Sequence, residues 1–466
     1  MNLLFRSATV IDPSLKLNAR RDVFVRDGRV TSIESSSQAA TAGNTRVIDC
    51  DGLLLAPGFI DLHVHLREPG NDAAETIATG SLAAARGGFT TVFCMPNTNP
   101  VCDSPVIVRY MLDRAREEGC GVRVLPVAAV TRGQTGEVMN DFSALWAKGR
   151  RCGAFSDDGR PVADAGVMRR AMMAIAELKR GEGGADGRGA VIFDHCEDMS
   201  LTGDGVMHEG RVSLRLGLKG IPRSSEATIV ARDAALALET GCRLHICHVS
   251  NRDSVEAIRH YKSRGAPITA EVTPHHLLFT DELVAQGAPG RGPFDTHAKM
   301  KPPLCGEEDR QALIAALEDG TIDCIATDHA PHTPASKDTV FDAAPFGIIG
   351  METAFPALYT GFVTSGRWTA EFLIDRLACA PARVMRPASG SPDPRVSPGT
   401  ISPGAFADLV LIDPAASGLF TEADLGSRSR NCPWLGVPLK SRIVATLVAG
   451  SPAWLSADSR FDALRG

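Results

Sequence analysis

Eight apolar segments recur between residues 56 and 329, and amphipathic helical patterns separate most of them. The segments are apolar throughout rather than alternating, which is typical of strands buried on both faces of a parallel sheet. The strands are predicted near 56–66, 90–97, 122–130, 151–158, 190–197, 243–250, 268–275 and 322–329. The helical patterns cover 74–85, 104–118, 164–178, 225–239, 252–263 and 307–317. Eight strand-then-helix units predict an α/β fold, a TIM-like (β/α)8 barrel.

An open doubly wound sheet is the alternative fold. Such a sheet usually carries a glycine-rich phosphate turn, and neither G-x-G-x-x-G nor G-x-x-x-x-G-K-[ST] follows any of the predicted strands. The barrel is therefore favoured, and 466 residues leave room for a further domain.

Both ends of the chain contain short strand signals. These lie at 3–5, 22–25, 30–33, 403–413 and 441–450. A linker rich in Pro, Ser and Gly spans 387–404, and neither end alone has enough strands for a stable sheet. We therefore predict a small β-sandwich domain made from 1–55 together with 388–466, and a barrel domain over 56–387.

Five predicted strands end in side chains that can bind metal ions. The candidates are His63 and His65, the pair Asp157-Asp158, His195, His248 and Asp328. In a parallel barrel the carboxyl ends of the strands share one mouth, where catalytic residues lie. Histidine nitrogens and carboxylate oxygens suit two divalent ions, with zinc the first choice. One such histidine alone is more often structural, but this many at strand ends favour a metal site.

The spacing of these residues predicts the direction of the histidine side chains, but it does not predict which aspartate of the pair faces the mouth. His63 and His65 stand two residues apart on a strand, so both imidazoles face one side, and Arg67 shares that side if the strand continues. Asp157 and Asp158 are neighbours, so only one of them faces the mouth, while the other would cap the following turn. The spacing does not decide between them.

Two metal ions would lower the pKa of a shared water to near 7 and provide hydroxide at neutral pH. The expected reaction is hydrolysis at a carbonyl, or its reverse. Asp328 could bind one ion and also carry a proton from the water to a leaving nitrogen, first as general base and then as general acid. Its alternative role is that of a ligand only.

The net charge and the composition limit the classes of molecule that the protein is expected to bind. The net charge is -6 and the isoelectric point about 6.1, which argues against nucleic acid or an anionic membrane as partner. No apolar run approaches the roughly 20 residues of a membrane span, and the first residues lack the layout of a signal peptide. The twelve cysteines are scattered, as expected for reduced thiols. The expected location is the cytoplasm.

At the candidate ligands the chain resembles the class I dihydroorotases of the amidohydrolase superfamily, over nearly its whole length. The motifs that carry the resemblance are P-G-F-I-D-L-H-V-H-L-R-E-P-G (57–70), C-M-P-N-T (94–98), A-F-S-D-D-G (154–159), D-H-C-E-D (194–198), C-H-V-S (247–250), A-T-D-H-A-P-H (326–332) and A-P-F-G-I-I-G-M-E-T-A (344–354). The superfamily as a whole shares H-x-H, whereas the first and sixth motifs together are specific to this family.

The resemblance implies a function and a set of site residues. The reaction is the zinc-dependent, reversible cyclisation of N-carbamoyl-L-aspartate to L-dihydroorotate in pyrimidine biosynthesis. The implied ligands of two Zn²⁺ per subunit are His63, His65, Asp158, His195, His248 and Asp328, with Asp158 bridging and Asp157 left as the turn residue. The implied substrate contacts are Arg67 and Asn97 to a carboxylate, His332 to the ring, and the main chain at Pro345, Phe346 and Gly347.

One position departs from the family. In K-M-K-P-P-L (299–304), Lys301 stands where the family usually has an asparagine that helps to hold the substrate. A lysine adds a positive charge and lacks the acceptor of an amide. We expect either a stronger hold on the substrate carboxylate or a side chain directed to solvent.

Two other functions remain open. The chain could be another cyclic amidohydrolase, such as a hydantoinase, dihydropyrimidinase or allantoinase, although H-x-H-x-R together with M-P-N-T suits a substrate with its own carboxylate. It could also be a silent homologue that serves as a structural partner of aspartate transcarbamoylase, but the complete ligand set argues against this. A homodimer is the expected assembly. The segments 286–303 and 333–347 are candidates for a lid.

Overall fold

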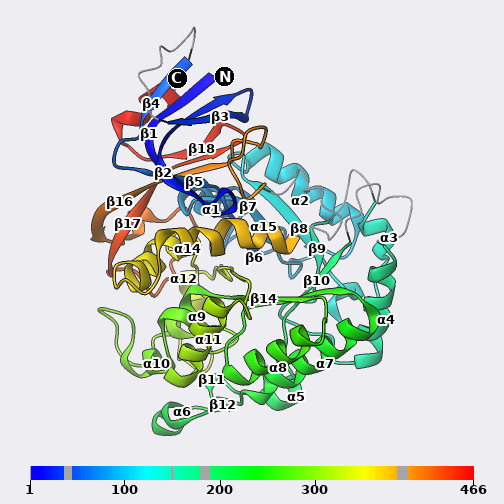
Figure 1. Cartoon of the computed structure of the whole chain (residues 1–466). Coiled ribbons are helices and arrows are strands. Elements are labelled where there is room, and N and C mark those ends of the chain that lie inside the picture. The colour runs from blue at the N-terminus through cyan, green and yellow to red at the C-terminus, as the bar shows by residue number, and fades with distance from the viewer. Residues whose placement is uncertain (1, 36–44, 148–151, 179–188, 386–396, 466) are drawn as a thin grey trace.

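Eight parallel strands lie in chain order around a central barrel in the computed structural model (Figure 1). The structure describes the chain except for residues 1, 36–44, 148–151, 179–188, 386–396 and 466. The barrel strands are β6 (Phe59–Val64), β7 (Phe89–Cys94), β8 (Arg123–Ala128), β9 (Ala154–Phe155), β10 (Val191–Asp194), β13 (Arg243–Ile246), β14 (Ile268–Val272) and β15 (Cys324–Ile325). Nearly every residue in them is buried, which explains why the segments are apolar throughout.

The barrel closes between its first and last strands. Val64 of β6 forms a parallel bridge with His329, which follows β15. Asp61 of β6 accepts hydrogen bonds from the Thr327 main-chain N–H at 3.0 Å and from its hydroxyl at 2.5 Å. The predicted (β/α)8 barrel is therefore confirmed, and the open doubly wound sheet is excluded.

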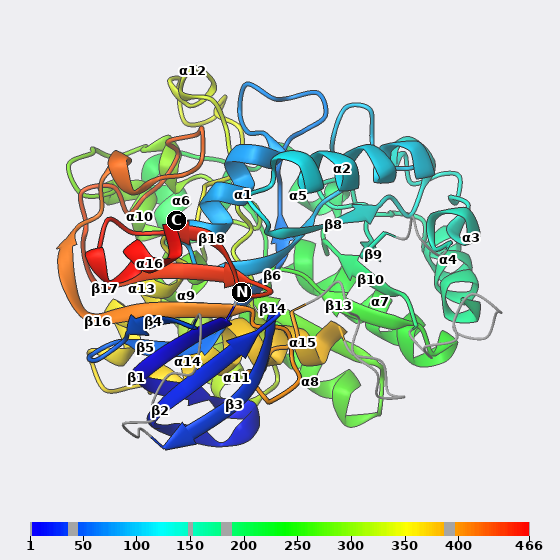
Figure 2. The same cartoon turned by 90° about the horizontal axis from the view of Figure 1, so that it is seen from above.

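Helices cover the outside of the barrel (Figures 1 and 2). The longer ones are α1 (Ile77–Arg86), α2 (Pro105–Glu118), α4 (Ala165–Glu177), α7 (Ser224–Thr240), α8 (Arg252–Ser263) and α11 (Glu307–Asp319). They coincide with the predicted helices to within three residues at each end. The largest shift is at the start of α1, where the Thr76 hydroxyl accepts from the N–H of Thr79 and so fixes the first turn after it.

Strands from both chain ends form a second, mixed sheet beside the barrel (Figures 1 and 2). Its members are β1 (Asn2–Asp12), β2 (Leu17–Arg26), β3 (Arg29–Ser35), β4 (Thr45–Asp49), β5 (Leu54–Pro57), β16 (Leu409–Leu419), β17 (Pro438–Val448) and β18 (Ser451–Leu455). The prediction that strands from the two termini combine is confirmed, and the described strands form one mixed sheet where a β-sandwich was predicted. Most of the predicted linker 387–404 lies outside the described residues, and the domain ranges 1–55 with 388–466 and 56–387 stay a prediction.

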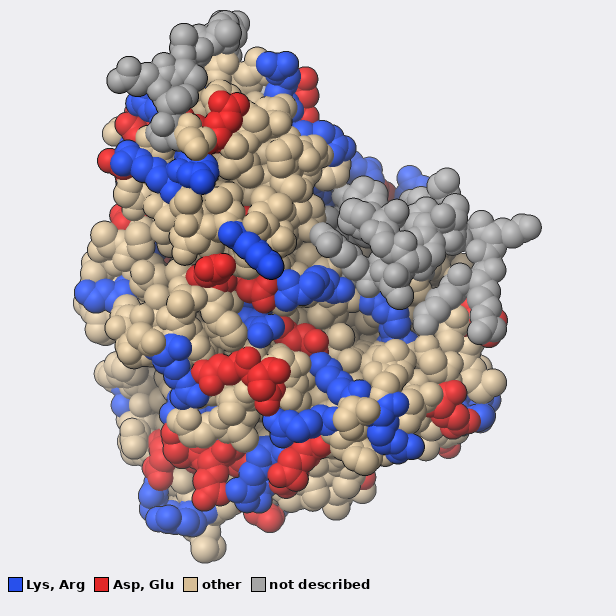
Figure 3. Space-filling view, in the orientation of Figure 1, with Lys and Arg blue, Asp and Glu red and all other residues tan. Residues whose placement is uncertain are grey.

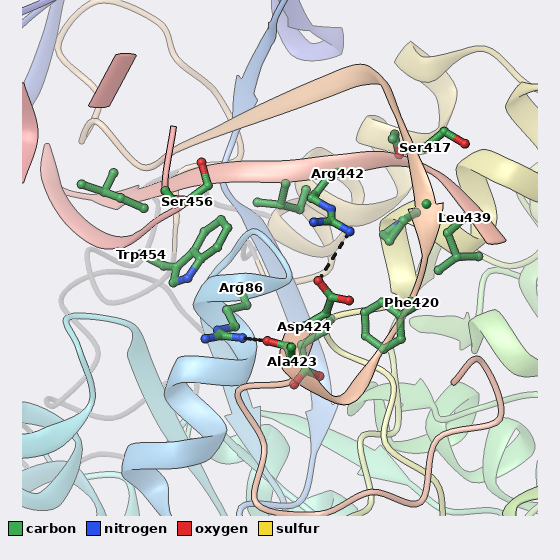
Figure 4. A pocket seen from close by; sticks show the side chains of 16 residues that line it. Arg86, Ser417, Phe420, Ala423, Asp424, Leu439, Arg442, Trp454 and Ser456 are labelled. Atoms are coloured by element: carbon green, nitrogen blue, oxygen red, sulfur yellow. Dashed lines mark hydrogen bonds and ion pairs between the residues drawn. The ribbon is translucent and has the colours of Figure 1, made fainter. Parts of the chain in front are cut away.

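A segment between β16 and β17, residues 420–437, leaves the terminal sheet and returns to it; we call it the strap. Arg86 at the end of α1 donates to the carbonyl of Ala423 at 2.9 Å, and Arg442 Nη2 lies 3.5 Å from Asp424 Oδ1 (Figure 4). A cavity of about 310 Å³ lies between α1, the strap, β17 and β18. These contacts hold the strap between the sheet and the barrel, and from there it continues toward the barrel mouth.

Positive and negative side chains are interspersed on the face shown in Figure 3. This distribution agrees with the small net charge and shows no continuous basic field on that face. Among the described helices, none has both the length and the apolar character needed to cross a membrane.

Candidate metal centre and substrate pocket

The structure brings the six predicted ligands together at the carboxyl ends of the barrel strands. Each of them is buried, and they belong to or follow five strands: His63 and His65 at β6, Asp158 after β9, His195 after β10, His248 after β13 and Asp328 after β15. Because parallel strands point their carboxyl ends the same way, residues far apart in the sequence meet at one place.

Asp158 lies at the centre of this cluster. Its Oδ1 is 3.2 Å from His63 Nε2, 3.4 Å from His195 Nδ1 and 3.7 Å from His248 Nε2, and its Oδ2 is 3.5 Å from His65 Nε2. Two groups of metal-type ligands therefore share it, one with His63 and His65 and the other with His195 and His248. A carboxylate in this position can serve both groups of metal-type ligands.

Asp328 faces the first group. Its Oδ1 lies 3.2 Å from His65 Nε2 and 3.6 Å from His63 Nε2. Burial would raise the pKa of this carboxyl, but the two histidines hold it well below its usual range, so the group is ionised. Its φ of +48° is uncommon for a residue with a side chain, and such conformations concentrate at functional sites.

The cluster fits a bound cation. His63 Nε2 and Asp158 Oδ1 are buried and form no regular hydrogen bond within the protein, and a buried polar atom without a partner is rare. Imidazole nitrogens and carboxylate oxygens in this arrangement suit divalent ions of the zinc type. The buried His63, His65, Asp158, His195 and His248 are thus consistent with a metal site.

Glu271, near the end of β14, orients His63 from behind. Its two oxygens lie 3.1 Å from His63 Nδ1 and 2.9 Å from His245 Nε2. Burial would raise the pKa of Glu271, but the hydrogen bonds and charges of the two histidines lower it to about 2. Because a carboxylate only accepts, Nδ1 of His63 carries the hydrogen and its Nε2 keeps a lone pair for a metal ion.

Asn97 and Glu197 orient two other histidines in the same way. Asn97 Oδ1 lies 2.9 Å from His65 Nδ1, and Glu197 Oε2 lies 3.1 Å from His195 Nε2. The other nitrogen of each ring faces the cluster, where His195 Nδ1 lies 2.9 Å from His248 Nε2. Glu197 and Glu271 were not among the predicted site residues, although Glu271 is an acidic residue inside an apolar strand, which is an unusual pattern.

Asp157 and Asp158 point to different places, as strand alternation requires. The side chain of Asp157 accepts from the main-chain N–H groups of Val130, at 2.8 Å, and Thr131, at 3.1 Å, and from the Thr131 hydroxyl. Only its main-chain carbonyl takes part in the following turn, where it accepts from Arg160 N at 2.9 Å. The expectation that its side chain caps this turn is therefore corrected, because the carboxylate is used to fasten the loop after β8.

Arg67 and His332 lie on loops next to the metal-type ligands. Arg67 Nε donates to the carbonyl of Pro331 at 3.1 Å, which fixes the plane of the guanidinium. His332 Nε2 lies 2.7 Å from the carbonyl oxygen of Phe346, so it carries the hydrogen of this bond. Burial, together with the charge of Arg67, lowers the pKa of His332 to about 3, so its ring is neutral.

Asn431, from the strap, fastens the two loops that contain these residues. Its Nδ2 donates to the carbonyls of Ala330, at 3.0 Å, and Gly347, at 3.1 Å, and its Oδ1 accepts from His332 N at 3.2 Å. Gly347 has a φ of +133°, and an added Cβ would lie 2.9 Å from the Ala330 oxygen, so only glycine fits there. No local sequence pattern points to Asn431, which is about a hundred residues away from His332.

Two buried lysines hold the segment before Gly347. Lys299 Nζ donates to the carbonyls of Phe341 at 2.8 Å and Asp342 at 2.9 Å. Lys337 Nζ donates to the carbonyls of Thr296 at 2.9 Å and Pro345 at 2.8 Å. Burial lowers the pKa of Lys337 to about 7. The candidate lid segment 333–347 is therefore fixed largely through its own carbonyl groups.

Lys301 has a partner that the sequence did not suggest. Its Nζ lies 2.9 Å from Glu197 Oε1 and 5.2 Å from the ring centre of Phe346. The expectation of a side chain directed to solvent is not met, because the ammonium pairs with a buried carboxylate.

The comparisons with known proteins agree with the site. The Dihydro-orotase-like family model matches residues 52–254. A dihydroorotase from Pelotomaculum thermopropionicum is 45% identical over 97% of this chain and 98% of its own length, and one from Anaeromyxobacter dehalogenans is 45% identical over 96% of each. Among solved structures, the L-hydantoinase from Arthrobacter aurescens superposes with a TM-score of 0.78 at 22% identity, covering 98% of this chain and 96% of that one, which shows a shared fold. Given the identity to curated dihydroorotases over nearly its full length, the chain belongs to the dihydroorotase family of the amidohydrolase superfamily.

Proposed function

We propose that the protein catalyses the reversible cyclisation of N-carbamoyl-L-aspartate to L-dihydroorotate, with two Zn²⁺ per subunit. The observation that carries this proposal is the position of Asp158 between two histidine pairs, with Asp328 facing one of them. His63, His65 and Asp328 would hold one ion, His195 and His248 the other, and Asp158 would contact both. When bound, the ions supply Lewis acidity at a carbonyl and lower the pKa of water toward 7.

Asp328 is proposed to move the proton. In the hydrolytic direction a water proton passes to its carboxylate while the water oxygen attacks the ring amide carbonyl. The C–N bond then breaks, and Asp328 returns the proton to the leaving nitrogen. Asp328 is ionised at neutral pH, so its carboxylate has a lone pair with which to accept the proton. Ring closure follows the same path in reverse.

Arg67 and Asn97 are proposed to hold the carboxylate that both forms of the substrate carry. A guanidinium whose plane is fixed by Pro331 offers a flat fork that matches a carboxylate in two-point contact. Neutral His332 and the main chain at 345–347 would line the ring.

The test is turnover by purified, zinc-loaded protein. Dihydroorotate should yield carbamoyl aspartate, and Asp328→Asn should abolish turnover while most of the zinc stays bound. Asp338→Asn, on an exposed residue of the same region, serves as the control and should leave the rate unchanged. Turnover of hydantoin or allantoin without turnover of dihydroorotate would instead assign the protein to another cyclic amidohydrolase activity.

A homodimer, a complex with aspartate transcarbamoylase and a cytoplasmic location are further parts of the proposal, and they rest on the family resemblance. Size-exclusion chromatography coupled to light scattering, with and without the transferase, tests both assemblies. A monomeric elution at micromolar concentration would contradict the dimer.

A further inference from the structure

Lys301, Glu197 and His195 form a continuous line of contacts that ends at the metal-type ligands. Lys301 Nζ lies 2.9 Å from Glu197 Oε1, and Glu197 Oε2 lies 3.1 Å from His195 Nε2. On the far side of the ring, His195 Nδ1 is 3.4 Å from Asp158 Oδ1. The ammonium therefore stands on the opposite side of His195 from the cluster and is linked to it through Glu197.

Glu197 orients His195 most strongly as an ionised acceptor, because a hydrogen bond to a charged group is about twice as strong as one to a neutral group. As a carboxylate it forces the imidazole hydrogen onto Nε2, which leaves the Nδ1 lone pair toward Asp158. Glu197 is only 7% exposed, and apart from His195 and Lys301 it accepts from the Thr202 hydroxyl at 2.6 Å. A buried carboxylate without a cation is costly, and one hydroxyl does not compensate it.

We propose that Lys301 is a positioning residue of the metal centre: its ammonium holds Glu197 in place, and Glu197 in turn holds His195 with Nδ1 directed at the metal position. This inference rests on the proposed function for the identity of the centre. It gives Lys301 a different task from that of the asparagine usual at this position, because its charge is directed to Glu197 and not to the substrate carboxylate. Removing the charge should therefore weaken metal binding more than substrate binding.

The test measures zinc binding without substrate. Metal-free wild type, Lys301→Met, Lys301→Arg and Lys219→Met are titrated with Zn²⁺ in competition with a chromophoric chelator. Lys219 is the matched control, since it also pairs with an acid, Asp204, but on the surface. Lys301→Met should bind one of the two ions roughly tenfold more weakly, as is typical when a residue supporting a metal ligand is lost. Lys301→Arg should restore most of the affinity, and Lys219→Met should match wild type.

A second variant and a spectrum exclude a simple folding defect. Glu197→Gln keeps the shape of the side chain, so it should weaken one ion in the same way while circular dichroism stays unchanged. With Co²⁺ in place of Zn²⁺, both Glu197→Gln and Lys301→Met should shift the visible absorption bands, which report the geometry of the ligands. Unchanged affinity and spectrum in either variant would overturn the proposal.

Kinetics at saturating zinc separate this role from substrate binding. For Lys301→Met the KM for dihydroorotate should stay close to that of wild type. A raised KM with wild-type zinc affinity would show that Lys301 holds the substrate and would overturn the inference. If wild type itself fails to convert dihydroorotate, the proposed function falls, whereas the zinc titration still decides the role of Lys301.

Discussion

Replacing Glu271 with glutamine tests whether a buried carboxylate behind the metal centre stabilises the fold through its two histidine partners. The side chain has no exposed surface and accepts from His63 and His245. Glutamine has nearly the same shape, but its NH₂ group would face a ring N–H. One of the two histidines must then lose its hydrogen bond or change its tautomer.

The depressed pKa gives the size of the effect. The pKa of Glu271 is about 2 in the folded protein and 4.5 as the ordinary value, a difference that corresponds to about 3 kcal/mol of folding free energy. Because the folded pKa is the lower one, this contribution is fully present above 4.5 and is lost as the pH falls toward 2. About 2 kcal/mol of it should be gone at pH 3.

Urea denaturation of metal-free protein, followed by tryptophan fluorescence between pH 6 and 3, measures this contribution. The difference in unfolding free energy between wild type and Glu271→Gln should be largest at pH 6 and should shrink by about 2 kcal/mol at pH 3. Glu137→Gln, on an exposed residue, should follow the wild-type curve. Parallel curves for wild type and Glu271→Gln would refute the assigned role.

Three further predictions concern the pocket and its supports. Asn431→Ala should lower the free energy of unfolding by about 2 to 3 kcal/mol, because three hydrogen bonds of about 1 kcal/mol each are lost. It should also raise the KM for dihydroorotate, and an unchanged KM would contradict the role of Asn431 as an anchor. In wild type, the free energy of unfolding should rise between pH 7 and 10, because Lys337 binds a proton there in the unfolded chain but, with a pKa of about 7, not in the folded protein. Lys337→Met should flatten this rise. Chemical denaturation at several pH values measures the slope, and the same slope in both proteins would contradict the assigned pKa shift. Arg67→Lys should raise the KM for dihydroorotate roughly tenfold while the zinc content stays the same, because a lysine cannot offer a two-point contact. Steady-state kinetics and metal analysis measure both quantities, and an unchanged KM with a lower zinc content would contradict the assigned role.

Much of this architecture can be predicted from local patterns. A strand buried on both faces has to be apolar, so the barrel strands can be recognised in the sequence by their composition. Ligands such as His65 and His195 directly follow such strands, and parallel topology alone brings them to one mouth. The alternation of side chains also predicts that Asp157 and Asp158 diverge, although it does not say which one turns inward.

The residues that support the site could not be predicted in this way. The pairing of Lys301 with Glu197 joins two loops about a hundred residues apart, and no local pattern encodes it. Glu271 interrupts an apolar strand, but an acid in a strand does not reveal which histidine it will face. Such contacts depend on the final packing of the loops, which follows from the whole fold and not from a single segment.

The strap makes the pocket depend on a part of the chain that is synthesised after the entire barrel. All six metal-type ligands lie before residue 330, yet the loops at Ala330 and Gly347 share their anchor at Asn431. A nascent chain that has not reached residue 431 therefore lacks this anchor, even with every metal ligand in place. All six ligands thus precede the anchor in the sequence, and the metal site and the substrate pocket draw on different parts of the chain although they are adjacent in space.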